Sequence, residues 1–344
     1  MNAAAKNYDG VNKYIRITDI DEASSTYTDK DIVSPDGVLT DNYLVNNRDI
    51  LLARTGASTG KSYLYKKSDG KLYYAGFLIR ANVTTHDPYF VFSQLHTHRY
   101  WRWVSIMSAR SGQPGINSQE YSSFPIYTTS IEEESKIAKL LSLLDERIAT
   151  QNKIIDKLQS LIKGISSRIF ASIQGIEYRM GDIVTITNGN SNVQDAVTQS
   201  KEGLYPFFDR SEDIKYLPTF LFDKEAIIYP GEGTEFMPRY FKGKFALHQR
   251  CYAIFDFNEI INARFLYFYL KTRNSYFVKN AVGSTVPSLR LDTFQKLKVI
   301  IPPTKTQHSV SSCLSSMEQK CNVEKKILHK LLKQKQYLLR QMFI

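Results

Sequence analysis

Residues 140–159 read LLSLLDERIATQNKIIDKLQ, and their apolar side chains recur in alternating steps of three and four residues. This spacing is a heptad seam, which is typical of a coiled-coil helix. The seam extends in both directions, from Ile137 to Ile169. We therefore predict one long helix whose seam must be buried against another helix.

A second copy of this helix follows 173 residues later. The register holds without a gap from Ser111 and Ser284 to Phe170 and Phe343, and the polar seam residue Gln151 recurs as Glu324. Because one seam cannot be buried alone, we predict that the two helices pack against each other and run antiparallel. Partner proteins could cover the two seams instead. The seam residues expected to be buried are Ile137, Leu141, Leu144, Ile148, Ile155, Leu158, Val310, Leu314, Met317, Leu328, Leu331 and Leu338.

The parts of the chain before each helix repeat as well, at an offset of 175 residues. Residues 49–56 match 224–231, and residues 90–97 match 265–272. Short apolar runs predict strands at residues 49–53, 77–79, 226–229 and 297–301, whereas residues 88–97 and 262–272 have the pattern of short amphipathic helices. The copies are unequal, because a strand-like stretch and a polar loop precede residue 205 in the second copy. Only about a dozen residues stand there in the first copy, before the aligned residue 13.

These patterns predict an α+β fold with a pseudo-two-fold internal repeat. Two similar mixed α/β domains would be separated by two long helices packed as an antiparallel coiled coil. The expected domains are residues 1–130, which are shortened at the start, and residues 171–303. The expected helices are residues 131–170 and 304–344.

Composition places the chain among soluble proteins. Its apolar share is 42% and its charged share is 23%, and no long uncharged apolar stretch or signal peptide occurs, so we expect a cytoplasmic protein. The three cysteines lack metal-ligand spacing. Cys313 and Cys321 fall in a helical pattern, where we expect them to be small buried residues.

Most of the net charge of +11 lies at the end of the chain. Basic and acidic residues number 14 and 12 in residues 1–130, and 16 and 14 in residues 171–303, but 8 and 2 in residues 304–344. An excess of basic residues suggests an anionic partner. The near balance in the two globular parts makes charge alone a weak argument for nucleic-acid binding.

The chain contains two motifs that imitate catalytic ones. Residues 55–62, TGASTGKS, lack one residue of a phosphate-binding loop, and a strand and turn are expected after them instead of a helix. Residues 86–90, HDPYF, resemble a methyltransferase box, but a helix start with proline in its first turn explains them better. We find no catalytic constellation, and we expect no catalytic residue, cofactor or metal ion.

Loops at matching positions of the two copies are rich in side chains that bind DNA. Arginine pairs with guanine and glutamine or asparagine with adenine, whereas lysine, serine and threonine hold phosphates. The DNA-binding candidates are Arg54, Lys61, Arg110, Gln113, Asn117, Arg239, Lys242, Lys244, His248, Gln249, Arg250, Ser284, Thr285 and Arg290.

The helix at residues 140–159 resembles the conserved central region of the specificity subunit of type I restriction-modification systems. The resemblance extends over nearly the whole chain, through the turn at residues 49–61, the segments around Pro114 and Pro287, the entry at residues 300–303 to the second helix, and the duplicated order itself.

This resemblance implies two target-recognition domains that each read one half of a split DNA target, with the helices setting the gap between the halves. It also implies a non-catalytic subunit that binds double-stranded DNA and docks two modification subunits, with restriction subunits joining through the complex. The shortened first copy departs from the family's pattern. A different hypothesis is a non-enzymatic coiled-coil scaffold whose end domains bind proteins.

Overall fold

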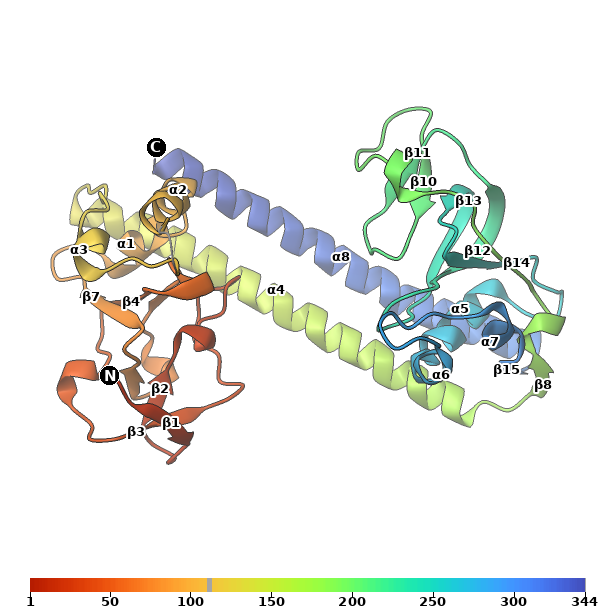
Figure 1. Ribbon diagram of the computed structural model, residues 1–344, viewed down its shortest axis with the longest axis horizontal. Helices are drawn as coiled ribbons and strands as arrows, with labels where there is room; N and C mark the ends of the chain where they lie inside the picture. The colour runs from red at the N-terminus through yellow and green to blue at the C-terminus, as the bar shows by residue number, and fades with distance from the viewer. Residues whose placement is uncertain (110–112, 344) are drawn as a thin grey trace. The chain divides into compact units, whose positions relative to one another are not determined.

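Two long helices span the segments where the seam was predicted. In the computed structural model, which describes residues 1–109 and 113–343, helix α4 spans Ile131–Ser172 and helix α8 spans Thr304–Met342 (Figure 1). All twelve residues expected in the seam are buried or half-buried. Apolar residues outside the seam, such as Leu140 and Leu143, are exposed.

The chain divides into two units, and both long helices contribute to each. The first unit is Met1–Lys153 with Lys325–Ile344, and the second is Ile154–Glu324. The first half of α4 therefore meets the last half of α8 in the first unit, where Leu141 shares a core with Leu339. In the second unit Phe170 shares a core with Leu314. The helices are antiparallel, as the sequence predicted.

The globular part of the first unit contains three small sheets, with the strand orders β5-β4-β7, β2-β6 and β1-β3. Its strands are β1 (Ala4–Asn7), β2 (Lys13–Ile15), β3 (Val33–Asp36), β4 (Asp49–Ala53), β5 (Ser62–Leu64), β6 (Leu72–Tyr74) and β7 (Leu78–Asn82). Its short helices are α1 (Pro88–Gln94), α2 (His98–Met107) and α3 (Ser118–Ser122). Helix α1 ends before the predicted Thr97, because the Thr97 side chain caps the start of α2.

The globular part of the second unit has one six-stranded sheet, β11-β10-β13-β12-β14-β9, and a two-stranded sheet, β15-β8. Its strands are β8 (Ile176–Arg179), β9 (Thr185–Asn188), β10 (Tyr205–Phe208), β11 (Lys215–Leu217), β12 (Phe222–Pro230), β13 (Arg239–Leu247), β14 (Cys251–Phe255) and β15 (Lys298–Ile301). Its short helices are α5 (Ala263–Lys271), α6 (Asn274–Asn280) and α7 (Leu291–Gln295). Aromatic side chains such as Phe265, Phe277 and Phe294 fill its core.

The sheets repeat between the units with a small change in alignment. Strands β4 and β7 end on the pair Ala53–Leu78, and β12 and β14 end on the pair Pro230–Cys251. The next residue is therefore Arg54 in one unit and Gly231 in the other, whereas the sequence offset paired Arg54 with Tyr229. That alignment was wrong by two residues. An even shift preserves which face each side chain occupies, so the apolar pattern could not reveal it.

The units differ at the start of the sheet. In the second unit β9 pairs with the outer edge of β14, and the Ser191 amide donates to the Leu247 carbonyl. In the first unit the nitrogen of Met1 donates to the corresponding carbonyl of Tyr74. Among the described residues, the β5-β4-β7 sheet ends at β7, with no strand in the place of β9.

Each globular part is tied to its long helix by one fully buried polar side chain in the first turn of that helix. Glu134 accepts a hydrogen bond from the Asp87 amide at 2.9 Å, and Gln307 accepts one from the Asn262 amide at 2.7 Å. Asp87 and Asn262 are the N-cap residues of α1 and α5. The two joints are therefore built in the same way, and each fixes the angle at which its globular part meets the helix.

The expectation for Cys313 was wrong. Cys321 is buried, but Cys313 is exposed on α8, because it lies one residue before the seam residue Leu314 and faces outward. Within the described part of the chain, no helix is long and apolar enough to cross a membrane.

Candidate nucleic-acid interface

Four segments of the second unit meet at one surface, which we call the second loop surface: residues 188–192, 231–235, 248–250 and 282–288. Ser191 accepts from the Gln249 amide at 3.1 Å, and the Gly231 amide donates to the Arg250 carbonyl at 2.9 Å. The Gly233 amide donates to the Pro287 carbonyl at 3.0 Å. Backbone hydrogen bonds thus fix these loops to one another, so their side chains are presented in a defined arrangement.

Two glycines allow the backbones to come this close. A Cβ atom on Gly189 would lie 1.9 Å from the Leu247 carbonyl oxygen, and one on Gly231 would lie 2.1 Å from the Arg250 carbonyl oxygen. Neither distance is possible for a real side chain. In the second unit, a side chain at either position would therefore force these backbones apart.

Residues of the second loop surface line part of a hollow of about 500 Å³. The predicted DNA-binding residues His248, Gln249 and Arg250 line it together. Sequence reasoning missed the other residues of the lining, which are Val193, Asp209, Arg210, Ser211, Lys215, Glu232 and Cys251. Arg210 is the most informative of these, since it is an exposed arginine for which no ion pair is found within the described chain.

The carboxylate of Asp209, the residue before Arg210, is held by hydrogen bonds. Asp209 accepts hydrogen bonds from Lys215 at 2.6 Å and from the Ser211 amide at 2.8 Å. Burial alone would raise the pKa of Asp209, but the hydrogen bonds from Lys215 and Ser211 outweigh it and lower the pKa below the ordinary value. Asp209 is therefore ionised and holds the turn that presents Arg210.

Arg239, a predicted DNA-binding residue, has a structural role instead. Its guanidinium stacks over the Phe208 ring at 5.0 Å and donates to the backbone carbonyls of Asp209 and Ser211. Burial lowers the pKa of Arg239, although an arginine still remains charged. Arg239 therefore supports the loop that carries Arg210, and only part of its side chain reaches the surface.

His248 and Cys251 add neutral groups to the hollow. Burial lowers the pKa of His248 below its ordinary value, so the imidazole is neutral at neutral pH. Its Nδ1 accepts from the Arg250 amide at 3.2 Å, which leaves the Nε2 hydrogen free to donate. Burial raises the pKa of Cys251 to about 11, so its thiol stays protonated. The charges on this surface are therefore those of its arginines, its lysine and its acids.

The lysines of β13 lie elsewhere. Lys242 is 3.9 Å from Glu225, and the ammonium of Lys244 lies 4.8 Å from the Phe220 ring centre. Both side chains are exposed, but neither lines the hollow of the second loop surface. The structure therefore does not group them with His248, Gln249 and Arg250.

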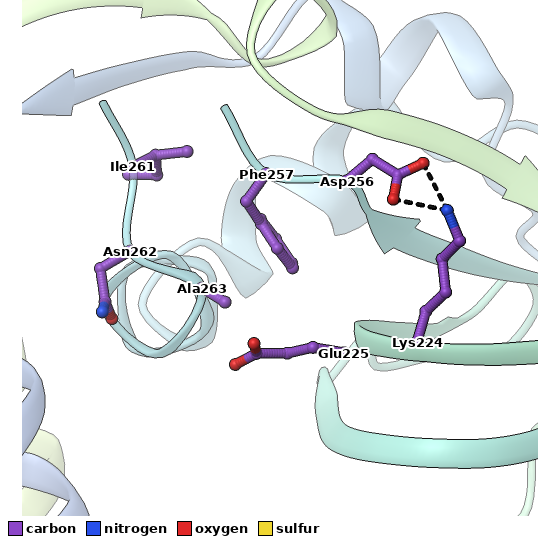
Figure 2. Close-up of a pocket in the computed structure, with 7 residues that line it drawn as sticks. All are labelled: Lys224, Glu225, Asp256, Phe257, Ile261, Asn262 and Ala263. Carbon is purple, nitrogen blue, oxygen red and sulfur yellow. Dashed lines mark hydrogen bonds and ion pairs between the residues drawn. The ribbon is translucent and has the colours of Figure 1, made fainter. Parts of the chain in front are cut away.

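A second hollow, of about 510 Å³, lies beside the start of α5 and is shown in Figure 2. Lys224 forms an ion pair with Asp256 at 2.6 Å within its wall, and Glu225 accepts a hydrogen bond from Tyr240. None of the predicted DNA-binding residues lines it. Because its charged groups already have partners within the protein, we do not assign a ligand to it.

The remaining candidates of the second unit are on or near the 282–288 loop. Ser284, Thr285 and Arg290 are all exposed. Ser288 forms bridges with Glu232 and with Val282, which connects this loop to the hollow. Arg290 is the N-cap residue of α7, and its side chain is exposed to solvent.

The first unit forms an equivalent surface, which we call the first loop surface, from residues 54–60, 77 and 113–117. The Ile116 amide donates to the Arg54 carbonyl at 2.9 Å, and the Gly56 amide donates to the Pro114 carbonyl at 2.9 Å. The side chains of Arg54 and Gln113 are exposed there. These two predicted residues are therefore brought together.

Two other candidates of the first unit already have partners. Lys61 is largely covered and pairs with Glu22 at 3.1 Å. The Asn117 side chain accepts from the Glu120 amide and caps α3. The predicted residue Arg110 lies outside the described residues.

The imitations of catalytic motifs fold as the sequence suggested. After the turn at residues 56–58, the chain enters strand β5, so no helix N-terminus faces a phosphate. Pro88 stands in the first turn of α1. Among the residues that the structure describes, no group of histidine, cysteine or acidic side chains could hold a metal ion.

Comparison with known proteins relates most of the chain to one family. The family described as "Type I restriction modification DNA specificity domain" matches residues 1–160 and again 176–333. The specificity subunit of the Escherichia coli type I restriction enzyme EcoDI is 28% identical over 138 residues, which are 40% of this chain and 30% of that protein. The MjaVIII specificity subunit of Methanocaldococcus jannaschii is 28% identical over 127 residues, or 37% of this chain and 29% of that protein. The aligned part thus spans less than a third of these relatives.

Solved structures show the same fold. The S subunit of a type I restriction-modification system from M. genitalium superimposes with a TM-score of 0.69 at 18% identity, covering 98% of this chain and 89% of that one. A chain from a study of complex assembly and conformational transition of the type I R-M system has a TM-score of 0.55 at 13% identity, with coverage of 96% and 90%. Because the family's domain matches residues 1–160 and again 176–333, this chain belongs to the specificity family of type I restriction-modification systems.

Proposed function

We propose that this chain is the DNA sequence-recognition subunit of a type I restriction-modification complex. Each loop surface would read one half of a split DNA target, and α4 with α8 would set the gap between the halves. The chain would act without catalysis of its own, in the cytoplasm, on double-stranded DNA.

The observation that carries this proposal is the repeated joint between loop surface and helix. Glu134 and Gln307 stand at equivalent places, are 0% and 1% exposed, and each binds the N-cap amide of the helix next to its sheet. Such a joint prevents the globular part from rotating on its helix. A rigid joint of this kind is needed if a protein is to hold a reading surface in register with DNA.

A further hydrogen-bonded layer supports each joint. In the first unit Asp145 accepts from the Tyr89 hydroxyl at 2.6 Å and pairs with Lys335 of α8 at 2.6 Å. In the second unit Glu318 accepts from the Tyr267 hydroxyl at 2.8 Å and pairs with Lys271 at 2.8 Å. Each acid thereby connects a long helix to a short helix of the globular part.

The outward faces of the long helices support docking of other subunits. Leu140, Leu143 and Leu161 on α4 are between 43% and 52% exposed, and Leu332 and Tyr337 on α8 are 42% and 63% exposed. Exposed apolar side chains along a helix favour contacts with partner proteins. We propose that two modification subunits dock here, and that restriction subunits join through them.

The near balance of charge in the globular parts fits a complex in which other subunits supply much of the affinity for DNA. Residues 1–130 and 171–303 each exceed neutrality by only two basic residues, so they contribute little sequence-independent attraction to phosphates. The modification subunits would supply much of the affinity, and the loop surfaces would supply the choice of bases.

The test is to express the chain with the modification subunit encoded beside it and to map methylated adenines across the host genome. We expect a split motif with a constant gap. A soluble complex that adds no methylation would contradict the reading role. Failure to form any complex with that subunit would favour a protein-binding scaffold.

A further inference from the structure

The two loop surfaces share one pair of equivalent positions that carry different side chains. In the first unit the Arg54 amide donates to the Phe77 carbonyl at 3.0 Å, and in the second unit the Gly231 amide donates to the Arg250 carbonyl at 2.9 Å. Phe77 therefore occupies the place of Arg250. Equivalence of backbone hydrogen bonds is a stricter criterion than sequence similarity, because the hydrogen bonds fix position in space.

The partner position follows from the next residue. Thr55 forms a bridge with Gly115, and Glu232 forms a bridge with Ser288. The flanking bonds agree, since Gly56 donates to Pro114 and Gly233 donates to Pro287. Thr55 therefore occupies the place of Glu232.

The second unit uses this pair as an ion pair. Arg250 Nη1 lies 2.7 Å from Glu232 Oε1, and the two side chains are 62% and 17% exposed. Glu232 thus holds the arginine from the loop side and leaves most of the guanidinium exposed. An arginine held in this way has donors left for guanine O6 and N7, and a nearby carboxylate can accept from cytosine N4.

The first unit presents apolar chemistry at the same place. Phe77 is 60% exposed, and Thr55 beside it is half-buried and uncharged. Phenylalanine and the threonine methyl group are side chains that contact the methyl group of thymine in the major groove. A large aromatic ring left exposed on a loop between hydrogen-bonded backbones is otherwise unfavourable in water.

We infer that positions 55 and 77 in the first unit, and 232 and 250 in the second, form one specificity pair that occurs twice. The Glu232–Arg250 pair selects a G·C base pair in its half-site, and the Thr55–Phe77 pair selects an A·T base pair in the other. Arg250 contacts guanine directly, and Glu232 acts as a positioning residue. This inference rests on the proposed function and names the bases that it would read.

The test is to exchange the two pairs of residues in the full chain. Each variant is assembled with the modification subunit, and the complex is used to select bound sequences from a random pool of duplex DNA. The variants are Glu232→Thr with Arg250→Phe, and Thr55→Glu with Phe77→Arg. We expect the first to lose guanine and gain thymine at one position of one half-site, and the second to do the reverse in the other half-site. Arg250→Phe alone should weaken binding to the original site by about 10-fold to 100-fold.

Glu232→Gln separates positioning from simple structural support. It removes a negative charge and frees Arg250, so affinity for random DNA should rise and the salt dependence should steepen by about one phosphate contact. Discrimination at the guanine position should fall at the same time. A variant that merely destabilised the loop would lose affinity for all DNA. Glu259→Thr, at an exposed acid of the same unit outside the second loop surface, is the matched control and should change no base preference.

The outcomes distinguish this inference from the proposed function. If the unaltered chain selects a split motif and both exchanges leave it unchanged, or if Glu259→Thr produces the same change, the specificity pair is wrong and the proposed function stands. If the unaltered complex selects no split motif, the proposed function fails and the inference fails with it.

Discussion

Replacing Gln307 by alanine tests whether the joint between loop surface and helix is rigid. The Gln307 side chain makes three hydrogen bonds while only 1% exposed: it accepts from the Asn262 amide, and it donates to the carbonyls of Ile260 at 2.8 Å and Pro302 at 2.9 Å. Alanine removes all three and leaves their partners in a buried place. At about 0.5–1.5 kcal/mol for each bond, the second unit should lose about 3 kcal/mol of unfolding free energy.

Hydrogen exchange can localise this loss, and chemical denaturation can measure it. Amides of α5 should exchange roughly 100-fold faster in Gln307→Ala, because opening of the second unit becomes easier by that free energy. Gln319→Ala is the matched control, since Gln319 is exposed on the same helix and its loss should cost less than about 0.5 kcal/mol. A loss below about 1 kcal/mol in Gln307→Ala would refute the reasoning.

Gln307→Glu gives a second check, because it introduces the residue found at the equivalent place in the first unit. Glu134 there is surrounded by donors, namely the Asp87 amide, the Thr129 amide and the His86 ring. A carboxylate at residue 307 would instead face the carbonyls of Ile260 and Pro302. We expect Gln307→Glu to be at least as destabilising as Gln307→Ala, because it buries a charge against two acceptors.

Three further predictions follow from the structure. Burial lowers the pKa of His96 to about 4, so between pH 6.5 and 4 the unfolded chain binds a proton on this imidazole that the folded chain does not. The unfolding free energy of the first unit should therefore fall as the pH drops from 6.5 to 4. Denaturation measured across that range should show that His96→Asn loses this dependence. Gly231→Ala should lower the unfolding free energy of the second unit by about 2 kcal/mol or more, because its Cβ would lie 2.1 Å from the Arg250 carbonyl oxygen. Gly164→Ala, which has open space around it in α4, should raise the melting temperature. Equal effects of the two variants on stability would contradict this. Inserting one heptad in α4 and one in α8 lengthens each helix by about 10 Å. The gap between the two halves of the methylated motif should then grow by about three base pairs. An unchanged gap would exclude a role of the helices as the spacer.

The sequence predicted the elements whose signal is local. The heptad seam located α4 and α8, and the strands at residues 49–53 and 226–229 were found because short apolar runs ended at turn residues. The break between α1 and α2 was missed. Thr97 stops one helix by capping the next, and an amphipathic pattern that continues across the break hides such a cap.

The candidate site was less predictable because its residues meet only through the fold. His248, Gln249 and Arg250 are consecutive in the sequence, so one predicted DNA-binding loop included all three. Glu232 and Arg210 come from other loops, and nothing in the local sequence marks them as neighbours of Arg250. Arg239 shows the opposite failure, since its stacking on Phe208 depends on the pairing of distant strands.

The two loop surfaces separate what is held constant from what varies. Three backbone hydrogen bonds that join the loops recur in both units. The Arg54 and Gly231 amides donate to the Phe77 and Arg250 carbonyls, and the Gly56 and Gly233 amides donate to the Pro114 and Pro287 carbonyls. The Ile116 and Leu289 amides donate to the Arg54 and Gly231 carbonyls. The joints also share the hydrogen bond to the N-cap amide, although Glu134 places a carboxyl group there and Gln307 an amide group. At one pair of equivalent exposed positions the side chains differ, with Phe77 in one unit and Arg250 in the other. Because these hydrogen bonds join main-chain groups, the exposed side chains at positions 77 and 250 can change without moving the backbone that carries them. Under the proposed function, this separation lets the bases that each surface reads change while the backbone of the surface stays the same.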